Sequence, residues 1–168
     1  MDLSVTKEPF WTYLSQSQQD LISEGLYLVD FVKTAPPEKF NDYSFLVFPF
    51  AKALEGFLKQ VYLDADMISR LDYISDHLRL GKLLSPNLKE KLGERSLYLK
   101  LTNKTDEKFA IKVWQVWKVG RNQIFHYFSH NIKAVTFEEA IGLIDSILDL
   151  MRESYMRLLP PEKQKFTG

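Results

Sequence analysis

One stretch of the sequence, from Tyr43 to Leu63, is apolar on nearly every side when it is wound as a helix. A helix without a polar face has no side to present to water, so other helices must surround it. We therefore predict an all-α bundle with this segment as its central helix, capped by Asn41 and Asp42. Pro49 lacks a backbone donor and would clash with the carbonyl group of Phe45, which predicts a kink or a late helix start.

Apolar residues at helical spacing indicate two further helices. The first runs from Ser17 to Lys33 and stops before the Pro36-Pro37 breaker. The last begins at Thr136, which forms a Thr-x-x-Glu capping box with Glu139, and it carries one apolar face as far as Tyr155. In the sequence, the first of these helices precedes the central helix and the other follows it.

The segment after the central helix shows shorter patterns. Apolar residues within Ile68–Leu80 predict a short helix, and Gly81 is positioned to end it. Ser85-Pro86 then predicts the start of another short helix that reaches about Gly93.

The next part of the chain contains one ambiguous segment and one clear helix. The alternating residues Leu97–Leu101 are interpreted as a loop. A long helical pattern starts at Asp106 and runs through Trp117, with an interruption predicted at Gly120. The whole chain thus predicts a bundle of about five helices.

The length and composition favour a single domain. A chain of 168 residues with 45% hydrophobic residues is long enough for one core and short for two. No repeat or linker divides it, so we expect one domain over residues 1–168, with its core at about 17–158 and a flexible tail at 160–168.

The charge and cysteine content exclude several classes of function. The 22 basic and 22 acidic side chains cancel, so any phosphate-binding site must be local. The chain has no cysteine, which excludes disulfides, thiolate metal sites and a cysteine nucleophile. It shows no signal peptide and no apolar run long enough for a membrane span, so we expect a soluble cytoplasmic protein.

The stretch GRNQIFHYF, residues 120–128, places polar side chains in an apolar context. On an ideal helix Arg121 and His126 project roughly 140° apart, with about 7.5 Å of axial rise. For both to meet one substrate, the site must lie at a helix end or break, such as Gly120, or in a groove between two subunits.

These residues resemble the Arg-x(4–6)-His motif of the HEPN superfamily, in which a polar residue often follows the arginine. Within that superfamily the segments FPFAKALEGFLKQVYLD (48–64) and GRNQIFHY (120–127) resemble the carboxy-terminal domain of the RNase LS toxins. Those are bacterial toxin–antitoxin ribonucleases linked to phage defence. The resemblance spans about 42–158 and leaves out their amino-terminal domains.

The resemblance implies a metal-independent endoribonuclease without a cofactor. His126 would transfer a proton, since histidine changes its charge near neutral pH, and Arg121 would neutralise phosphoryl oxygens. Asn122 and Tyr127 would support them. One histidine does not serve both sides of an in-line displacement, so the resemblance also implies a homodimer, with RNA as substrate and an antitoxin protein as a partner.

Glu55 is the third candidate for a catalytic role. A carboxylate within the most apolar helix must be paired or reach water, because burying it alone costs several kcal/mol. The ordinary partners are Lys59 and Lys52 on the same helix. The resemblance instead implies that Glu55 orients Arg121 across the bundle.

Other interpretations of the same residues stay open. Arg70 and His77 also satisfy Arg-x(6)-His, but in a short middle helix with leucine after the arginine. A non-catalytic HEPN interaction module or toxin partner would keep the fold without cleavage. A metal hydrolase would use His126 and His130, although HYFSH lacks the glutamate of His-Glu-x-x-His.

The two tryptophans of the motif helix also have two interpretations. Trp114 and Trp117 precede the motif at helical spacing, within an apolar segment. We interpret them as core or dimer-interface residues. The alternative is a pair of platforms on which RNA bases stack.

Overall fold

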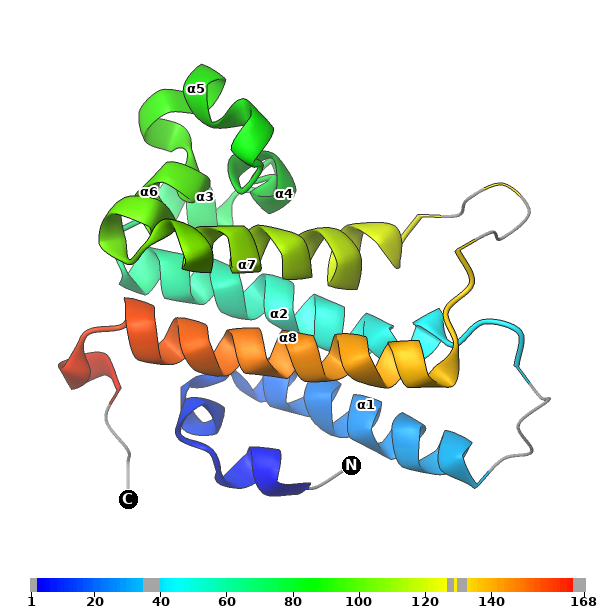
Figure 1. Cartoon of the computed structure of the whole chain (residues 1–168). Coiled ribbons are helices and arrows are strands. Elements are labelled where there is room, and N and C mark those ends of the chain that lie inside the picture. Colours follow the sequence, from blue (N-terminus) through cyan, green and yellow to red (C-terminus); the bar gives the residue numbers. More distant parts are fainter. Residues whose placement is uncertain (1–2, 35–39, 127–128, 130–132, 165–168) are drawn as a thin grey trace.

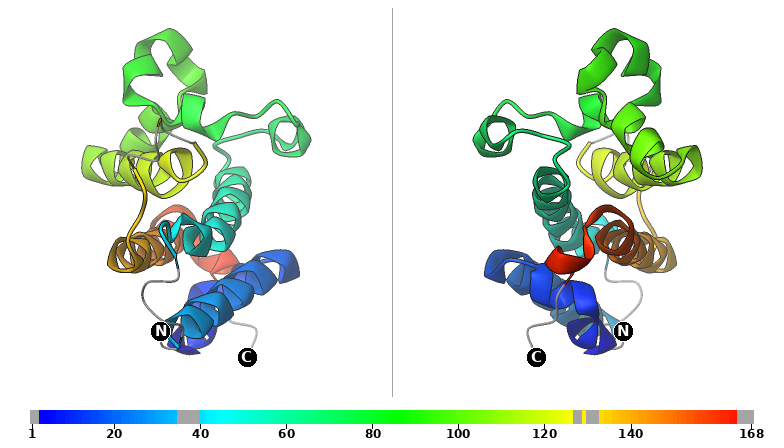
Figure 2. Two further views of the ribbon diagram at one scale, coloured as in Figure 1. Left: turned by 90° about the vertical axis from the view of Figure 1, so that its right-hand side faces the viewer. Right: turned by 90° about the vertical axis from the view of Figure 1, so that its left-hand side faces the viewer.

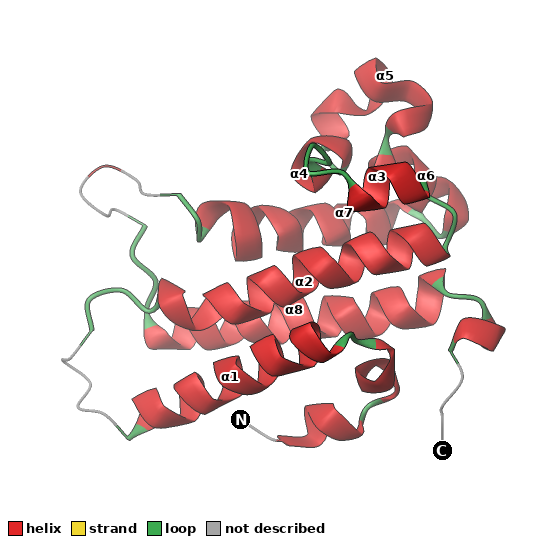
Figure 3. Cartoon of the chain, turned by 180° about the vertical axis from the view of Figure 1, so that it is seen from behind, coloured by secondary structure: helices red, strands yellow, loops and turns green. Residues whose placement is uncertain are grey.

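The computed structural model describes residues 3–34, 40–126, 129 and 133–164. Within these ranges every regular element is helical, as Figure 3 shows, which confirms the all-α prediction. The described termini carry short 3-10 turns: η1 (Leu3–Lys7) and η2 (Pro9–Tyr13) before the first long helix, and η8 (Pro161–Lys163) after the last. None of the described helices has the length and apolar content needed to cross a membrane.

Three long helices lie side by side and form the body of the molecule (Figure 1). They are α1 (Gln16–Lys33), α2 (Ser44–Asp64) and α8 (Phe137–Leu158). Helix α2 packs against both α1 and α8, and α7 (Glu107–Trp117) packs against α8. The buried face of α2 includes Phe50, Phe57 and Tyr62, all fully buried. The prediction of a central apolar helix is therefore confirmed.

The amino-terminal end of α2 differs from the late start that Pro49 suggested. The helix begins at Ser44 and continues through Pro49. Asp42 supports this end, because its Oδ1 atom accepts a hydrogen bond from the Ser44 N–H at 2.9 Å and another from the Val135 N–H at 3.3 Å. The same carboxylate thus ties α2 to the segment that precedes α8.

The two flanking helices start within one residue of the predicted positions, and α8 runs on to Leu158, beyond the predicted apolar face. Ser15 caps α1 and forms a capping box with Gln18. In the predicted capping box of α8, the Glu139 N–H donates to Thr136 Oγ1 at 3.2 Å and the Thr136 N–H donates to the Glu139 carboxylate at 2.8 Å. These bonds satisfy backbone donors that a helix start leaves without partners.

The chain between α2 and α6 forms a lobe that projects beyond the long helices (Figure 2). Its elements are short: α3 (Arg70–Ile74), α4 (Leu80–Leu83), η4 (Pro86–Leu88), α5 (Lys89–Leu92) and η5 (Gly93–Arg95). The helix predicted from Ser85 to Gly93 is present as η4 and α5, with Gly93 in a positive-φ conformation (52°) that favours glycine.

The single helix predicted over Ile68–Leu80 is wrong. Helix α3 ends at Ile74, where Ser75 turns into extended backbone, and Gly81 lies inside α4 and ends no helix. Leu71 and Ile74, assigned to its apolar face, are 77% and 65% exposed. None of the five residues of α3 is buried, so the tertiary packing of this segment, and not its apolar spacing, decides where the helix ends.

The loop predicted over Leu97–Leu101 is also wrong, because this segment belongs to α6 (Leu97–Lys104). The Ser96 side chain caps this helix by accepting a hydrogen bond from the Leu99 N–H at 3.3 Å. The buried residues Leu97, Tyr98 and Leu101 share one helical face that packs on α7. The alternation of leucines resembled a strand, whereas the packing against α7 selects the helix.

Charged side chains join α7 to α8 on the outside of the bundle. Glu153 accepts hydrogen bonds from Lys112 at 2.7 Å and from Arg157 at 3.0 Å. Burial alone would raise the pKa of the Glu153 carboxyl, but these two hydrogen bonds and the nearby positive charges lower it below its ordinary value. The network therefore stabilises the bundle only while Glu153 is ionised.

The end of the described chain returns to α8. The Gln164 side chain donates to the carbonyl groups of Met156 and Leu159, and Lys163 donates to the Asp64 carbonyl at 2.9 Å. The predicted tail is thus held against the bundle as far as Gln164, and residues 165–168 lie outside the described part of the chain.

Candidate functional site

The candidate site lies where α2 meets the chain that follows α7. Glu55 is on α2, next to the fully buried residue Leu54, and its own side chain is 29% exposed. Arg121 is on η6 (Lys118–Gln123), a π-helical turn that continues α7. Such turns occur often at functional sites because they change the direction in which side chains project.

The break predicted at Gly120 is this change from α-helix to π-helix. Gly120 is buried, and a Cβ atom there would lie 3.2 Å from two side-chain atoms of Ile147 on α8. Glycine therefore lets η6 approach α8 closely. The side chain of the next residue, Arg121, reaches Glu55 on α2.

Arg121 and Glu55 form a hydrogen-bonded ion pair. The Nε and Nη2 groups of Arg121 donate to the same Glu55 oxygen, Oε2, at 3.3 and 3.1 Å. The other oxygen, Oε1, lies 3.6 Å from Lys59 Nζ. The carboxylate thus contacts two of the three partners that the sequence left open, Lys59 on its own helix and Arg121 across the bundle, whereas no ion pair with Lys52 is found among the described residues.

Aromatic rings complete the surroundings of the Arg121 guanidinium. Its central carbon lies 5.5 Å from the ring centroid of Trp117 and 5.1 Å from that of Phe125. Both separations allow cation–π attraction. Arg121 is 31% exposed, and within the described residues its Nη1 amino group has no hydrogen-bond partner. The side chain is therefore held in place while part of its donor capacity faces outward.

His126 lies in the turn after η6. It is exposed, and its backbone N–H donates to the Gln123 carbonyl at 3.4 Å. Its imidazole makes no hydrogen bond or ion pair within the described residues. The chain has left the α-helix before this point, so the ideal angle between Arg121 and His126 does not apply.

Of the two residues predicted to support the site, Asn122 and Tyr127, only Asn122 lies within the described part of the chain. Asn122 is half-buried, and its side-chain nitrogen would lie 3.5 Å from a Cβ atom on Gly81, so it faces α4 while Arg121 faces α2. Tyr127 and His130, which belong to the supporting and metal-binding interpretations, lie outside the described residues. In the part of the chain that is described, no three histidine or carboxylate side chains are grouped to hold a metal ion.

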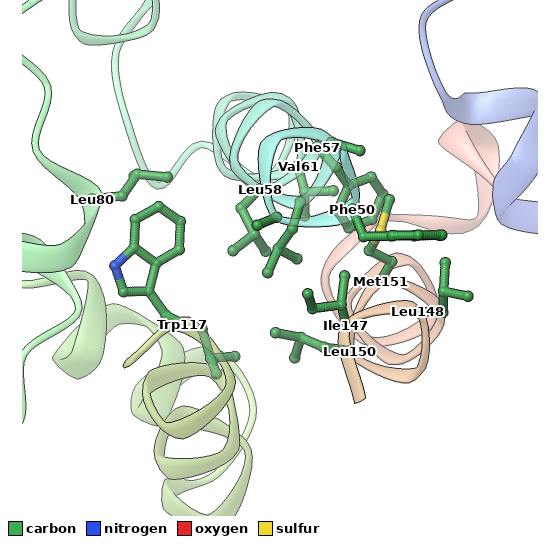
Figure 4. Packing of buried hydrophobic residues seen from close by; sticks show 14 of the residues in the cluster. Phe50, Phe57, Leu58, Val61, Leu80, Trp117, Ile147, Leu148, Leu150 and Met151 are labelled. Carbon is green, nitrogen blue, oxygen red and sulfur yellow. The ribbon is translucent and has the colours of Figure 1, made fainter. Parts of the chain in front are cut away.

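Trp117 belongs to the core, and Trp114 packs against it. Trp117 is 2% exposed and lies beside Leu80 of the lobe, as Figure 4 shows. Its indole N–H is buried and has no hydrogen-bond partner within the described chain. Trp114 is half-buried against the same core. Of the two interpretations of Trp117, the core one is confirmed, because its ring is not accessible for base stacking.

One aromatic pair was not foreseen in the sequence. The rings of Phe48 and Phe125 stack at a centroid distance of 4.1 Å, although they are 42% and 38% exposed. Phe48 precedes Glu55 by about two helical turns, so both lie on one face of α2. The spacing of Phe48 and Glu55 was the feature of the sequence that could have indicated this position. The stacked rings of Phe48 and Phe125 form an exposed apolar surface beside Arg121.

The second Arg-x(6)-His match does not form a comparable group. Arg70 begins α3 and is exposed, and His77 lies in the turn before α4. His77 lines a separate cavity in the lobe to which Arg70 does not contribute.

Comparison of the chain with protein-family models, curated proteins and solved structures finds no significant match.

Proposed function

We propose that the protein is a metal-independent endoribonuclease of the HEPN type, with Arg121, His126 and Glu55 as its catalytic group. The observation that carries the proposal is the pairing of Arg121 with Glu55 at a break in the helix. An arginine so placed is preorganised, so it loses little freedom when a phosphate binds. The free Nη1 amino group provides donors for that phosphate.

The reaction is the attack of an RNA 2′-hydroxyl on its own adjacent phosphorus. The 2′-oxygen forms a bond to phosphorus, and the bond from phosphorus to the 5′-oxygen breaks. One group removes the proton of the 2′-hydroxyl, and another gives a proton to the leaving 5′-oxygen. The products are a 2′,3′-cyclic phosphate and a 5′-hydroxyl.

Each residue has a defined part in this reaction. The His126 imidazole is exposed and free of partners within the described residues, so it is available for proton transfer. Arg121 stabilises the charge that develops on the non-bridging oxygens. Glu55 is a positioning residue, because it contacts Arg121 rather than the substrate.

A homodimer supplies the second proton-transfer group. One imidazole does not reach both sides of an in-line displacement, so two copies of the site side by side would share the two proton transfers. By its resemblance to the RNase LS toxins, the protein acts in a toxin–antitoxin or phage-defence system and has an antitoxin protein as its partner.

The test uses the substrate group on which the chemistry depends. The purified protein, with chelator present, is incubated with a single-stranded RNA and with the same sequence made of 2′-O-methyl nucleotides. We expect cleavage of the RNA alone, because the methylated strand has no attacking hydroxyl. Cleavage of both strands, or activity only after a metal is added, would reject this mechanism. Intact RNA together with tight binding of a partner protein would favour the non-catalytic HEPN module.

A further inference from the structure

A second cavity lies in the projecting lobe, apart from the Arg121 site. Its volume is about 290 Å³, and its walls come from α3, the turn before α4, α4 itself, α5 and η5. Leu78 and Leu83 form part of its lining and are both 8% exposed. The polar side chains that line it are Asp72, Ser75, His77, Arg79, Lys82 and Arg95.

The cavity gathers positive charge in a chain whose net charge is zero. Arg79, Lys82 and Arg95 are all exposed, and within the described chain none of them has a carboxylate within ion-pair distance. Arg79 donates to the backbone carbonyl of Asp76 at 2.8 Å, which orients the guanidinium without neutralising it. These three cations line one cavity without an ion pair among the described residues. The hydrogen bonds from Ser69 and, to a smaller extent, the charge of Arg95 lower the pKa of the Asp72 carboxyl.

Asp72 is the one carboxylate among the residues of this lining. It is engaged in the cap of α3, where it accepts hydrogen bonds from the Ser69 hydroxyl at 2.7 Å and the Ser69 N–H at 3.1 Å. Three cations against one engaged carboxylate leave the cavity positive. An anion bound against its buried leucines is partly shielded from water, which strengthens its attraction to the cations.

The lobe is also connected directly to the candidate site. A Cβ atom on Gly81 would lie 2.7 Å from the indole nitrogen of Trp117 and 3.5 Å from the side-chain nitrogen of Asn122. Trp117 in turn lies under the guanidinium of Arg121. Lys82 follows Gly81 on α4, so one short helix carries a cation of the cavity and contacts the surroundings of Arg121.

We propose that the cavity of Arg79, Lys82 and Arg95 binds a backbone phosphate of the same RNA strand whose scissile phosphate lies at Arg121. Arginine and lysine are the side chains that bind phosphate, and guanidinium groups do so through paired donors. This inference rests on the proposed ribonuclease function and extends it to a second contact. It assigns the cavity to substrate binding and gives it no part in the chemical step.

The test measures strand binding separately from cleavage. The probe is a fluorescently labelled, single-stranded 2′-O-methyl RNA, which does not provide the attacking hydroxyl. The double variant Lys82→Gln with Arg95→Gln removes two cavity charges. The matched control, Lys7→Gln with Lys108→Gln, removes two exposed cations outside the cavity. Folding of each variant is checked by circular dichroism, and a charge-preserving variant, Lys82→Arg with Arg95→Lys, completes the set.

We expect the cavity variant to bind about tenfold more weakly, and its salt dependence to be shallower by about 0.7 in log–log slope, the value for one phosphate on a single strand. The control and the charge-preserving variant should stay within about twofold of the wild type. Equal losses in the cavity and control variants would overturn the inference, because they would indicate a general charge effect.

Further results distinguish an RNA phosphate from a small phosphate anion, and the proposed phosphate contact from the proposed ribonuclease activity. Binding of inorganic pyrophosphate in the cavity, with no effect of the variant on the RNA strand, would assign the cavity to a small anion and overturn the inference. If the wild type cleaves no RNA but the methylated strand still depends on the cavity charges, the ribonuclease proposal fails and the phosphate contact stands. If RNA is cleaved but binding of the methylated strand does not depend on the cavity charges, only the proposal of the phosphate contact is rejected.

Discussion

The ion pair between Glu55 and Arg121 permits a quantitative prediction. Two donors share one carboxylate oxygen at 3.1 and 3.3 Å, longer than the best charge-assisted hydrogen bonds. Both side chains are about 30% exposed. Exposed pairs contribute about 0.2–1 kcal/mol and hydrogen bonds to charged groups about 1.5–3 kcal/mol, so we expect a coupling energy of about 1 kcal/mol.

A double-mutant cycle measures this coupling. Glu55→Ala, Arg121→Ala and the double variant are unfolded in urea, with fluorescence and circular dichroism as probes. The Glu55–Lys59 pair provides an internal control, because it spans 3.6 Å within one helix and should contribute only about 0.3–0.5 kcal/mol. A loss of about 1 kcal/mol would also lower Tm by about 2–4 °C.

The result that would refute this reasoning is a coupling for Glu55 and Arg121 no larger than that for Glu55 and Lys59. It would mean that the contact across the bundle does not hold the arginine. The site would then lack the preorganisation on which the ribonuclease proposal depends.

Two other predictions concern packing and pH. Gly25→Ala should destabilise the protein by about 1–2 kcal/mol, because its Cβ atom would lie 2.5 Å from the ring of the fully buried Phe50. The matched variant Gly142→Ala meets nothing within 4 Å and should stabilise it by about 0.5–1 kcal/mol; equal effects in urea unfolding would contradict the packing argument. Glu153→Gln should remove stability above pH of about 5, and its difference from the wild type should vanish as the pH falls through the lowered pKa of Glu153. A difference that persists in acid would show that ionisation of Glu153 is not the cause.

The long helices could be predicted because their signals are local. The capping box of Thr136 and Glu139 and the apolar face after it define α8 within the sequence itself. The all-apolar segment defines α2 in the same way, because only burial on all sides satisfies it. Such elements depend little on the rest of the chain.

The middle of the chain could not be predicted because tertiary contacts decide it. Residues Leu97–Leu101 alternate like a strand, and packing against α7 makes them helical. Within Ile68–Leu80 the apolar spacing suggested a buried face, yet Leu71 and Ile74 are exposed. Apolar spacing alone does not say which short segments find a surface to pack against.

The candidate site could likewise be predicted only in part. The need of Glu55 for a partner followed from its place in an apolar helix, and Arg121 is one of the two partners found. The stacking of Phe48 on Phe125 joins residues far apart in the sequence and was not predicted. The cavity in the lobe likewise depends on how several short elements meet.

The most direct test of the central claim is RNA cleavage by single variants in the presence of chelator. The wild type is compared with His126→Ala, Arg121→Ala and the control Gln123→Ala, which changes a polar residue of the same turn with no assigned part in the reaction. We predict 2′,3′-cyclic phosphate ends from the wild type and the control, and a loss of about 10²-fold or more in rate for His126→Ala and Arg121→Ala. Undiminished cleavage by folded His126→Ala would contradict the account.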